Sequence, residues 1–297
     1  MKPTLLLTAL ASLTVLGLTA CGGSANRAGL IQNKGSDTLV NVAQAWAEEY
    51  AKVNPVVSVA VSGGGSGVGI SAMINGTTDI ANASRAMKDK EIDLAKGNGI
   101  DPKEHIVGFD ALAVYVNKEN PIESISLEQL ADIYGEFGKT TKWSQLGITM
   151  PDEKSDEIIR VSRQNNSGTY AYFRNTVLGK SGNYKLGSLD LHGSKDVVEN
   201  VEITVGAIGY SGLAYATDHV KLVPVIRDGG EPVAPSTASA VDGSYPIARP
   251  LFMYTAGEPK GEVKAYMDWI LSPVGQKIIE AKGYAPVGTG TPAGTGN

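Results

Sequence analysis

Residues 57–75, VSVAVSGGGSGVGISAMIN, predict a strand, a glycine-rich turn and a helix in immediate succession. Val57, Val59 and Val61 alternate with small or polar residues, which is typical of a half-buried strand. The turn at 62–67 follows, and a helix is expected from about 68 to 75. Such a unit places the free N–H groups of a helix start at the end of a strand.

Polar turns that lead into a helix are expected at two other places in the chain. Residues 35–38 (Gly-Ser-Asp-Thr) precede a helix expected over 38–53, where apolar residues recur at helical spacing. A strand at 158–161 leads into residues 163–169 (Arg-Gln-Asn-Asn-Ser-Gly-Thr) and then into an aromatic-rich helix. All three segments thus place hydroxyl side chains and glycine at the start of an expected helix.

The remaining pattern also alternates strands with helices. Strands are expected at 106–116, 207–210, 222–226 and 247–254, helices at 127–134 and from about 258 with an interruption at 272–273, and a loop over 229–243. This alternation predicts an α/β protein with largely parallel sheets.

The first residues predict export. Residues 1–20 carry a basic Lys2 and an apolar run that is too short to span a bilayer, as in a signal peptide. Leu18-Thr19-Ala20-Cys21 fits a lipobox, and Cys21 is the only cysteine of the chain. We therefore expect Cys21 to carry the lipid anchor (palmitate), residues 21–29 to be a tether, and the protein to sit on the extracytoplasmic side of a bacterial membrane; an ordinary secretory signal is the alternative.

Composition excludes several classes of partner. The formal net charge is −5, without basic blocks, which argues against nucleic acid. No second apolar stretch reaches membrane-spanning length, so the lipid would be the only contact with the membrane. The 297 residues suit two domains.

Motifs for cofactor, metal or catalytic chemistry are missing. The glycines at 63–69 do not satisfy the dinucleotide spacing G-x-G-x-x-G. His105, His192 and His219 lie far apart, without metal-ligand spacing, and Ser66 lacks the second glycine of G-x-S-x-G. We expect no cofactor, no metal and no enzyme activity.

The Ser/Thr/Gly turns instead indicate anion binding. A helix start offers unpaired N–H groups, and glycine lets the backbone approach a ligand closely. Arg163 adds a guanidinium, whose charged hydrogen bonds contribute about 1.5–3 kcal/mol each, against ~0.3–1 kcal/mol for a helix dipole. Arg85 is a second candidate cation. Helix capping alone remains the alternative for each turn.

Several segments together resemble the phosphate-binding lipoproteins of bacterial high-affinity phosphate ABC importers. They are 35–38, 62–67, 79–85, 163–169, 206–210, 245–250, and Gly275-Gln276 followed by Gly283-Tyr284. The resemblance implies a two-domain type II periplasmic-binding-protein fold, with a hinge and a ligand cleft between the domains. It implies domain I at 30–115 plus 245–290 and domain II at 116–244, each boundary within about 15 residues.

The resemblance also implies the ligand and its contacts. Inorganic phosphate would be bound and delivered to a membrane-embedded ABC permease, by a receptor expected to be a monomer. The implied contacts are Thr38, Ser66, Gly67, Arg163, Ser167, Gly168 and Thr169, with the backbone after Asp37.

One departure from the family pattern concerns the phosphate proton. Longer relatives have an aspartate where this chain has Arg85, and that aspartate accepts the proton of hydrogen phosphate. Asp37 and Asp110 are the candidate replacements, with Asp37 preferred, although Asp37 could be only a helix cap.

Other functions remain open at this stage. Another tetrahedral oxyanion, such as sulfate, molybdate or tungstate, needs only donors and no acceptor. An extracytoplasmic phosphatase would need a metal cluster or an activated nucleophile. A surface phosphate sensor or adhesin is a further alternative.

Overall fold

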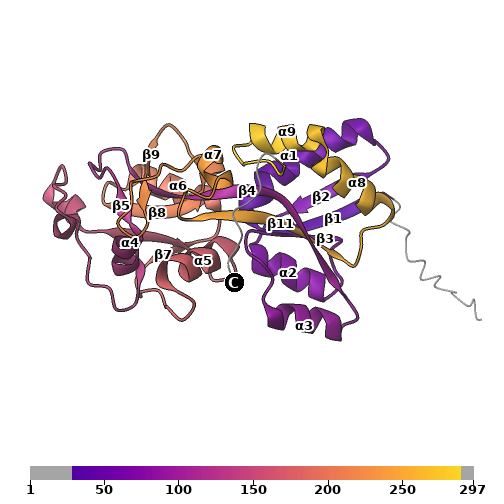
Figure 1. Cartoon of the computed structure of the whole chain (residues 1–297), viewed down its shortest axis with the longest axis horizontal. Helices are drawn as coiled ribbons and strands as arrows, with labels where there is room; N and C mark the ends of the chain where they lie inside the picture. The colour runs from indigo at the N-terminus through magenta and orange to yellow at the C-terminus, as the bar shows by residue number, and fades with distance from the viewer. Residues whose placement is uncertain (1–28, 289–297) are drawn as a thin grey trace, which may run out of the picture.

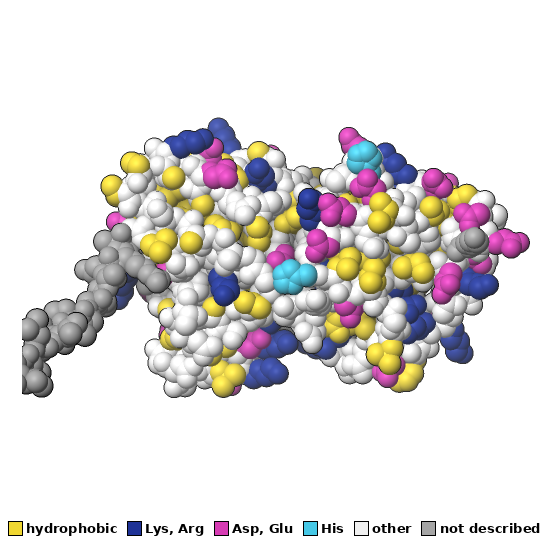
Figure 2. All heavy atoms as spheres, turned by 180° about the vertical axis from the view of Figure 1, so that it is seen from behind, with side chains coloured by type: hydrophobic (Ala, Val, Ile, Leu, Met, Phe, Trp, Pro, Cys, Tyr) yellow, Lys and Arg dark blue, Asp and Glu magenta, His cyan; other side chains and the backbone are white. Residues whose placement is uncertain are grey.

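The computed structural model describes residues 29–288 and shows two lobes joined by two long strands (Figure 1). These strands are β4 (Pro102–Asn117) and β11 (Ala248–Ala256). The predicted signal peptide, Cys21 and the tether up to residue 28 lie outside the described residues. None of the described helices has the length and apolar character needed to cross a bilayer. From behind, a hollow at the lower edge separates the lobes, and charges of both signs are spread over both (Figure 2).

The first lobe is built from the beginning and the end of the described chain. Its elements are β1 (Leu30–Gly35), α1 (Asp37–Val53), β2 (Ser58–Ser62), α2 (Ser66–Ile74), β3 (Ile80–Ala83), α3 (Asp89–Gly97), α8 (Gly261–Leu271) and α9 (Pro273–Ala281). α1 and α9 lie on one face of its sheet, and α2 and α3 lie on the other (Figure 1). The buried Trp46 of α1 donates its indole N–H to the Gly275 carbonyl at 2.8 Å, which ties α1 to α9.

The second lobe comes from the middle of the chain. Its elements are β5 (Ile125–Ser126), α4 (Leu127–Tyr134), η1 (Trp143–Leu146), η2 (Glu153–Asp156), β6 (Ile159–Arg163), α5 (Gly168–Phe173), η3 (Arg174–Leu178), β7 (Leu189–Leu191), α6 (Ser194–Ile203), β8 (Ala207–Gly212), η4 (Leu213–Tyr215), β9 (Val220–Val223), β10 (Val225–Ile226) and α7 (Thr237–Val241). Aromatic rings fill its core, where Phe173 stacks on Tyr210 with centroids 3.9 Å apart and Tyr134 meets both edge-on.

The expectation of largely parallel sheets is wrong for the centre of the molecule. The main sheet has the order β2-β1-β3-β11-β4-β8-β6-β7, with β9 also pairing with β4. Its outer pairs are parallel, but β11 is antiparallel to β3 and β4, and β4 is antiparallel to β8 and β9. The two crossing strands run in opposite directions because the chain passes to the second lobe on β4 and returns on β11.

Most expected elements are present, with shifted ends. The helix expected from 68 begins at Ser66, the strand expected at 106–116 extends over Pro102–Asn117, and α7 interrupts the loop expected at 229–243. The break at 272–273 separates α8 from α9. The short strands β1 and β3 were not expected, because buried asparagines, Asn33 and Asn82, interrupt their apolar patterns.

Gly35 ends β1 at a point where no side chain fits. Its φ is +142°, and a Cβ would lie 2.2 Å from the carbonyl oxygen of Asn82 on the paired strand. We expect Gly35→Ala to lower the free energy of unfolding by about 1–3 kcal/mol, measured by chemical denaturation. The matched control is Gly97→Ala, where a Cβ meets nothing within 4 Å and no loss of stability is expected. Equal stability of the two variants would contradict this explanation.

Candidate ligand-binding site

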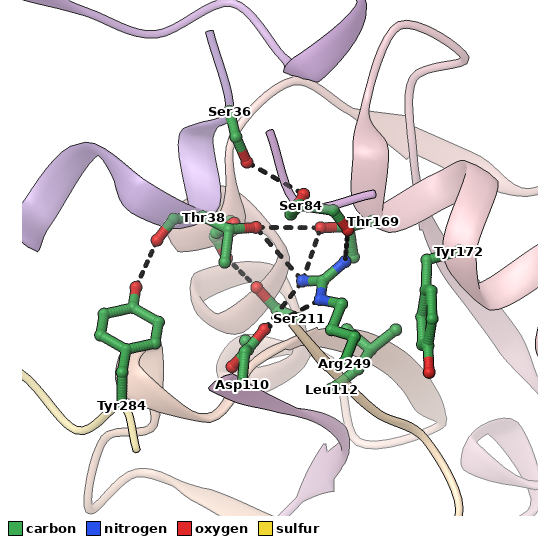
Figure 3. Close-up of polar contacts among 12 residues, drawn as sticks. Ser36, Thr38, Ser84, Asp110, Leu112, Thr169, Tyr172, Ser211, Arg249 and Tyr284 are labelled. Carbon is green, nitrogen blue, oxygen red and sulfur yellow. Dashed lines mark hydrogen bonds and ion pairs between the residues drawn. The ribbon is translucent and has the colours of Figure 1, made fainter. Parts of the chain in front are cut away.

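Five buried hydroxyl groups from both lobes meet between them, and Figure 3 labels four of these residues, Ser36, Thr38, Ser84 and Thr169. Ser36 Oγ donates to Ser84 Oγ at 2.9 Å, and Ser66 Oγ lies 3.3 Å from Ser84 Oγ. Thr38 Oγ1 of the first lobe lies 3.0 Å from Thr169 Oγ1 of the second. We call these five side chains the hydroxyl cluster. Ser36 and Ser84 follow β1 and β3, while Thr38, Ser66 and Thr169 lie in the first turns of α1, α2 and α5, so the cluster combines hydroxyls with helix starts.

Arg249 on β11 supplies a positive charge to the hydroxyl cluster. Its Nη2 donates to Thr38 Oγ1 at 3.3 Å and to Thr169 Oγ1 at 3.1 Å, and its Nη1 donates to the Ser84 carbonyl at 3.1 Å. The side chain is 1% exposed and its Cζ lies 5.5 Å from the centre of the Tyr172 ring. One guanidinium therefore contacts turns of both lobes.

Asp110 on β4 neutralises Arg249 across the two crossing strands. The Oδ2 atom accepts from Arg249 Nη2 at 2.8 Å and from Nε at 3.1 Å. The Oδ1 atom is buried and meets no donor of the described residues at full hydrogen-bond geometry. Burial raises the pKa of Asp110, and the Arg249 charge and the nearby Leu213 N–H offset only part of this rise. The site thus holds a carboxyl group that protonates more easily than an ordinary aspartate.

Arg163 and Asp37 form a second ion pair, also between the lobes. Arg163 Nη2 lies 2.9 Å from Asp37 Oδ2. Arg163 also donates from Nη1 to Ser194 Oγ at 2.9 Å, and from Nε and Nη2 to the His192 carbonyl at 3.1 and 2.5 Å. The other Asp37 oxygen accepts the Gly64 N–H at 2.9 Å. Both residues were predicted to face the ligand, and in this structure both bind other groups of the protein.

Ser167 and Gly67, two further predicted residues, lie at the junction of the lobes. Ser167 Oγ accepts the N–H groups of Thr169 and Tyr170 at 3.1 and 3.3 Å, so it caps α5. The Gly67 N–H donates to the Asn166 carbonyl at 2.9 Å, across the two lobes. The turn of the second lobe therefore rests directly on the start of α2.

Gly168, also predicted, touches the hydroxyl cluster with its backbone. A Cβ at this position would lie 2.2 Å from Ser66 Oγ and 2.6 Å from Ser84 Oγ. Only glycine lets the second lobe approach these hydroxyls so closely.

Arg85 is not brought into the cluster. Its Nη1 and Nη2 atoms each donate to a carboxylate oxygen of Glu91 at 2.8 Å, and Nη1 also donates to the Ala86 carbonyl. The guanidinium is therefore held beside the start of α3. Its neighbour Ser84 occupies the cluster instead.

Sequence reasoning missed Ser36, Ser84 and Arg249 as site residues, although each lies within a segment that carried the family resemblance. A signal for Arg249 did exist. Asp110 and Arg249 interrupt two otherwise apolar strand patterns with opposite charges, and buried charges are found paired. The serines gave no such signal, since hydroxyls before a helix usually cap it.

The next question is whether residues 29–288 offer a metal site or an active histidine. No group of three or more His, Cys, Asp or Glu side chains there is placed to hold a metal ion. His105 pairs with Thr255 Oγ1 at 2.9 Å, and His192 contributes only its carbonyl to Arg163.

Comparison with protein families identifies residues 22–274 as a PBP superfamily domain. The chain is 36% identical to Protein SphX of Synechococcus elongatus, over 89% of this chain and 79% of that protein. It is 32% identical to the Phosphate-binding protein PstS of Pseudomonas aeruginosa, over 87% of this chain and 83% of that protein.

The chain is also similar to solved structures of phosphate transport proteins. A putative phosphate ABC transporter substrate-binding protein of Clostridium perfringens, solved with bound phosphate, matches 87% of this chain and 99% of its own, at 30% identity and a TM-score of 0.76. An ABC-type phosphate transport receptor of Vibrio cholerae matches 86% and 99%, at 25% identity and a TM-score of 0.67.

We expect Arg163→Met to destabilise the protein, because it leaves the mostly buried Asp37 carboxylate without its cation. Loss of one partner of such a pair lowers the free energy of unfolding by about 3–5 kcal/mol. The measurement is chemical denaturation without ligand. Lys195→Met is the control, since its pair with Glu199 lies within one lobe and is mostly exposed, and we expect a loss below about 1 kcal/mol. A loss that small for Arg163→Met would contradict the importance of the interlobe pair.

Proposed function

The chain belongs to the PBP superfamily, and we propose that it is a receptor that binds inorganic phosphate between its lobes and delivers it to the permease of a bacterial ABC importer. The names of its relatives support this proposal, as does the bound phosphate of the Clostridium perfringens structure. We propose a binding function without catalysis.

The observation that carries the proposal is the hydroxyl cluster with Arg249 at its edge. A tetrahedral oxyanion presents several acceptor oxygens and needs converging donors. The hydroxyls donate to one another in this structure, so each O–H can turn to an anion without moving its backbone. Neutral hydrogen bonds contribute about 0.5–1.5 kcal/mol each, and those of the guanidinium roughly twice that.

Asp110 is our candidate for the group that accepts the proton of hydrogen phosphate. The sequence favoured Asp37, but both Asp37 oxygens already bind Arg163 and Gly64. The Oδ1 atom of Asp110 is buried, with the Leu213 N–H nearby but no donor at full hydrogen-bond geometry, and Arg249 links the carboxyl group to the hydroxyl cluster. A buried carboxylate repels a fully deprotonated dianion such as sulfate, whereas it can share the proton of hydrogen phosphate.

The proposed contacts follow from these placements. We propose that the hydroxyl cluster and Arg249 donate hydrogen bonds to the phosphate. Gly67, Ser167 and Gly168 would approach it through their backbone. Arg163 and Asp37 are assigned to holding the lobes together, and Arg85 is left out.

The two lobes suggest how the ligand enters. We propose that 30–115 with 245–290, and 116–244, move as two domains about β4 and β11, because donors buried between lobes become accessible only when the lobes part. The lipobox supports an anchor at Cys21 and an extracytoplasmic location, and we expect a monomer.

Calorimetric titration of the chain without its lipid tests the proposal. Phosphate should bind at one site, and sulfate or molybdate should bind at least about a hundredfold more weakly, because neither carries a proton for the buried carboxylate. Tighter binding of sulfate or molybdate would assign the receptor to another oxyanion. Absence of binding by all three would contradict a receptor for this class of anion.

The role of Asp110 gives a sharper prediction. Asp110→Asn replaces an acceptor oxygen by an NH2 donor, so phosphate affinity should fall by about 10- to 150-fold while sulfate competes better, as competitive titration would measure. Asp37→Asn is the control and should leave the phosphate-to-sulfate ratio unchanged. Relaxed selectivity in Asp37→Asn alone would move the acceptor role to Asp37.

A further inference from the structure

The short helix η4 of the second lobe reaches into the first lobe. Its middle residue, Ala214, packs against the buried apolar cluster of the first lobe, which includes Leu39 of α1 and Tyr284 near the end of the described chain. The approach is close, because a Cβ on Gly283 would lie 3.2 Å from Ala214 Cα. Gly283 also has a φ of +85°, so both the contact and the backbone favour glycine there. η4 is therefore a contact between the lobes.

The other two residues of η4 meet polar groups at the ligand site. The Leu213 N–H lies near the Asp110 carboxyl group and lowers its pKa. The Tyr215 hydroxyl donates to the Asp37 carbonyl at 2.5 Å. Three consecutive residues of one short helix thus touch a crossing strand, the end of the described chain and the start of α1.

A second tyrosine binds the next carbonyl of α1 from within the first lobe. Tyr284 is fully buried, and its hydroxyl donates to the Thr38 carbonyl (Figure 3) and to Asn41 Oδ1, the latter at 2.8 Å. The neighbouring Ala285 exchanges two backbone hydrogen bonds with Phe109 of β4, at 2.8 and 2.9 Å. The position of Tyr284 is therefore fixed to α1 and β4.

The two tyrosines differ in the lobe that carries them. Tyr284 belongs to the same lobe as α1, whereas Tyr215 belongs to the other lobe. Burial raises the pKa of both hydroxyls, so both keep their protons and donate at neutral pH. Parting of the lobes would therefore break the bond to the Asp37 carbonyl and keep the bond to the Thr38 carbonyl.

We propose that η4 completes the ligand site when the lobes close and that Tyr215 is its positioning residue. In the closed arrangement the Tyr215 hydroxyl fixes the Asp37 carbonyl, directly before Thr38, and so holds the Thr38 hydroxyl toward the anion. This inference rests on the proposed function, since it requires an anion between the lobes. It goes beyond that function because Tyr215 acts only through the backbone of α1 and sets how long the anion stays.

Two other roles for Tyr215 fit the contacts less well. A direct ligand contact would need the hydroxyl proton, which is already donated to the Asp37 carbonyl. A role in the core of its own lobe would need a partner there, but the bond reaches α1, 178 residues away in the chain. A bond that forms only on closure explains why the acceptor lies in the opposite lobe.

The first test measures how fast phosphate leaves. Tyr215→Phe keeps the ring and removes the hydroxyl, so phosphate should dissociate about 3- to 10-fold faster, as expected for the loss of one neutral hydrogen bond. Stopped-flow release of inorganic phosphate into a fluorescent phosphate trap measures this rate. The association rate should not fall, because the anion enters while the lobes are apart and the bond is absent.

Tyr134→Phe is the matched control. Its buried hydroxyl also donates to a backbone carbonyl, that of Ile208 at 2.8 Å, but this bond lies wholly within the second lobe. The variant loses a comparable bond without loosening the contact between the lobes. We expect its phosphate dissociation rate to stay within about twofold of that of the unaltered protein.

Hydrogen exchange gives a second readout, which general destabilisation would not move. The Gly67 N–H donates to the Asn166 carbonyl across the lobes, so in the phosphate-bound protein it should exchange with solvent only when the lobes part. Tyr215→Phe should speed this exchange about 3- to 10-fold, measured by NMR. The Phe109 N–H donates to the Ala285 carbonyl within the first lobe and should keep its rate.

Unchanged dissociation and unchanged Gly67 exchange in Tyr215→Phe would overturn the positioning role. Slower association would also overturn it, because the bond would then matter while the lobes are apart. Equal acceleration in Tyr134→Phe would do the same, since any lost buried hydrogen bond would then have this effect. An unaltered protein that binds no phosphate would instead contradict the proposed function itself.

Discussion

Asp110 and Arg249 face each other on the two strands that cross between the lobes, and their side chains are 0% and 1% exposed. Further hydrogen bonds offset the cost of burying such a charge pair, and removing one partner leaves the other uncompensated. Arg249 has such bonds, because it donates to Ser84 of one lobe and to Thr38 and Thr169 at their junction. The turns that would hold an anion are thus positioned by the Asp110–Arg249 pair. This pair lies on β4 and β11, the two strands about which the lobes would move.

Contacts between the lobes extend well beyond that pair. Asp37 binds Arg163, the Gly67 N–H binds the Asn166 carbonyl, and the Asn166 amide donates to the Gly64 carbonyl at 3.0 Å. All of these contacts form between groups of the protein itself. The affinity for a ligand is therefore a difference between the contacts that it makes and the interlobe contacts that it changes. Strengthening a direct contact raises affinity only to the extent that the lobes still close around it.

The sequence predicted the elements and turns whose pattern lies within one short segment. It did not predict features that depend on contacts between residues far apart in the chain. Strand, turn and helix at 57–75 are visible in one window, and so is Arg163 before Ser167. The direction of β11 cannot be read from one segment, because it depends on how the chain returns from the second lobe. The same limit explains Asp37, whose helix-start position suggested a cap or a ligand contact, whereas its partner is more than a hundred residues away. Family resemblance gave the overall architecture, but it did not assign Arg249.

The first lobe is interrupted in sequence by the whole of the second, and this order has a consequence for synthesis. Trp46 of α1 packs against Gly275 of α9, 229 residues later, and β3 pairs with β11 from the end of the chain. While the chain is being made, β1 can already pair with β2 and β3, but β3 still lacks its other neighbour, β11. The first lobe is therefore complete only after the last helices are made, and such long-range contacts slow folding. A polypeptide that has to pass through a narrow translocation channel before it folds gains from such a delay.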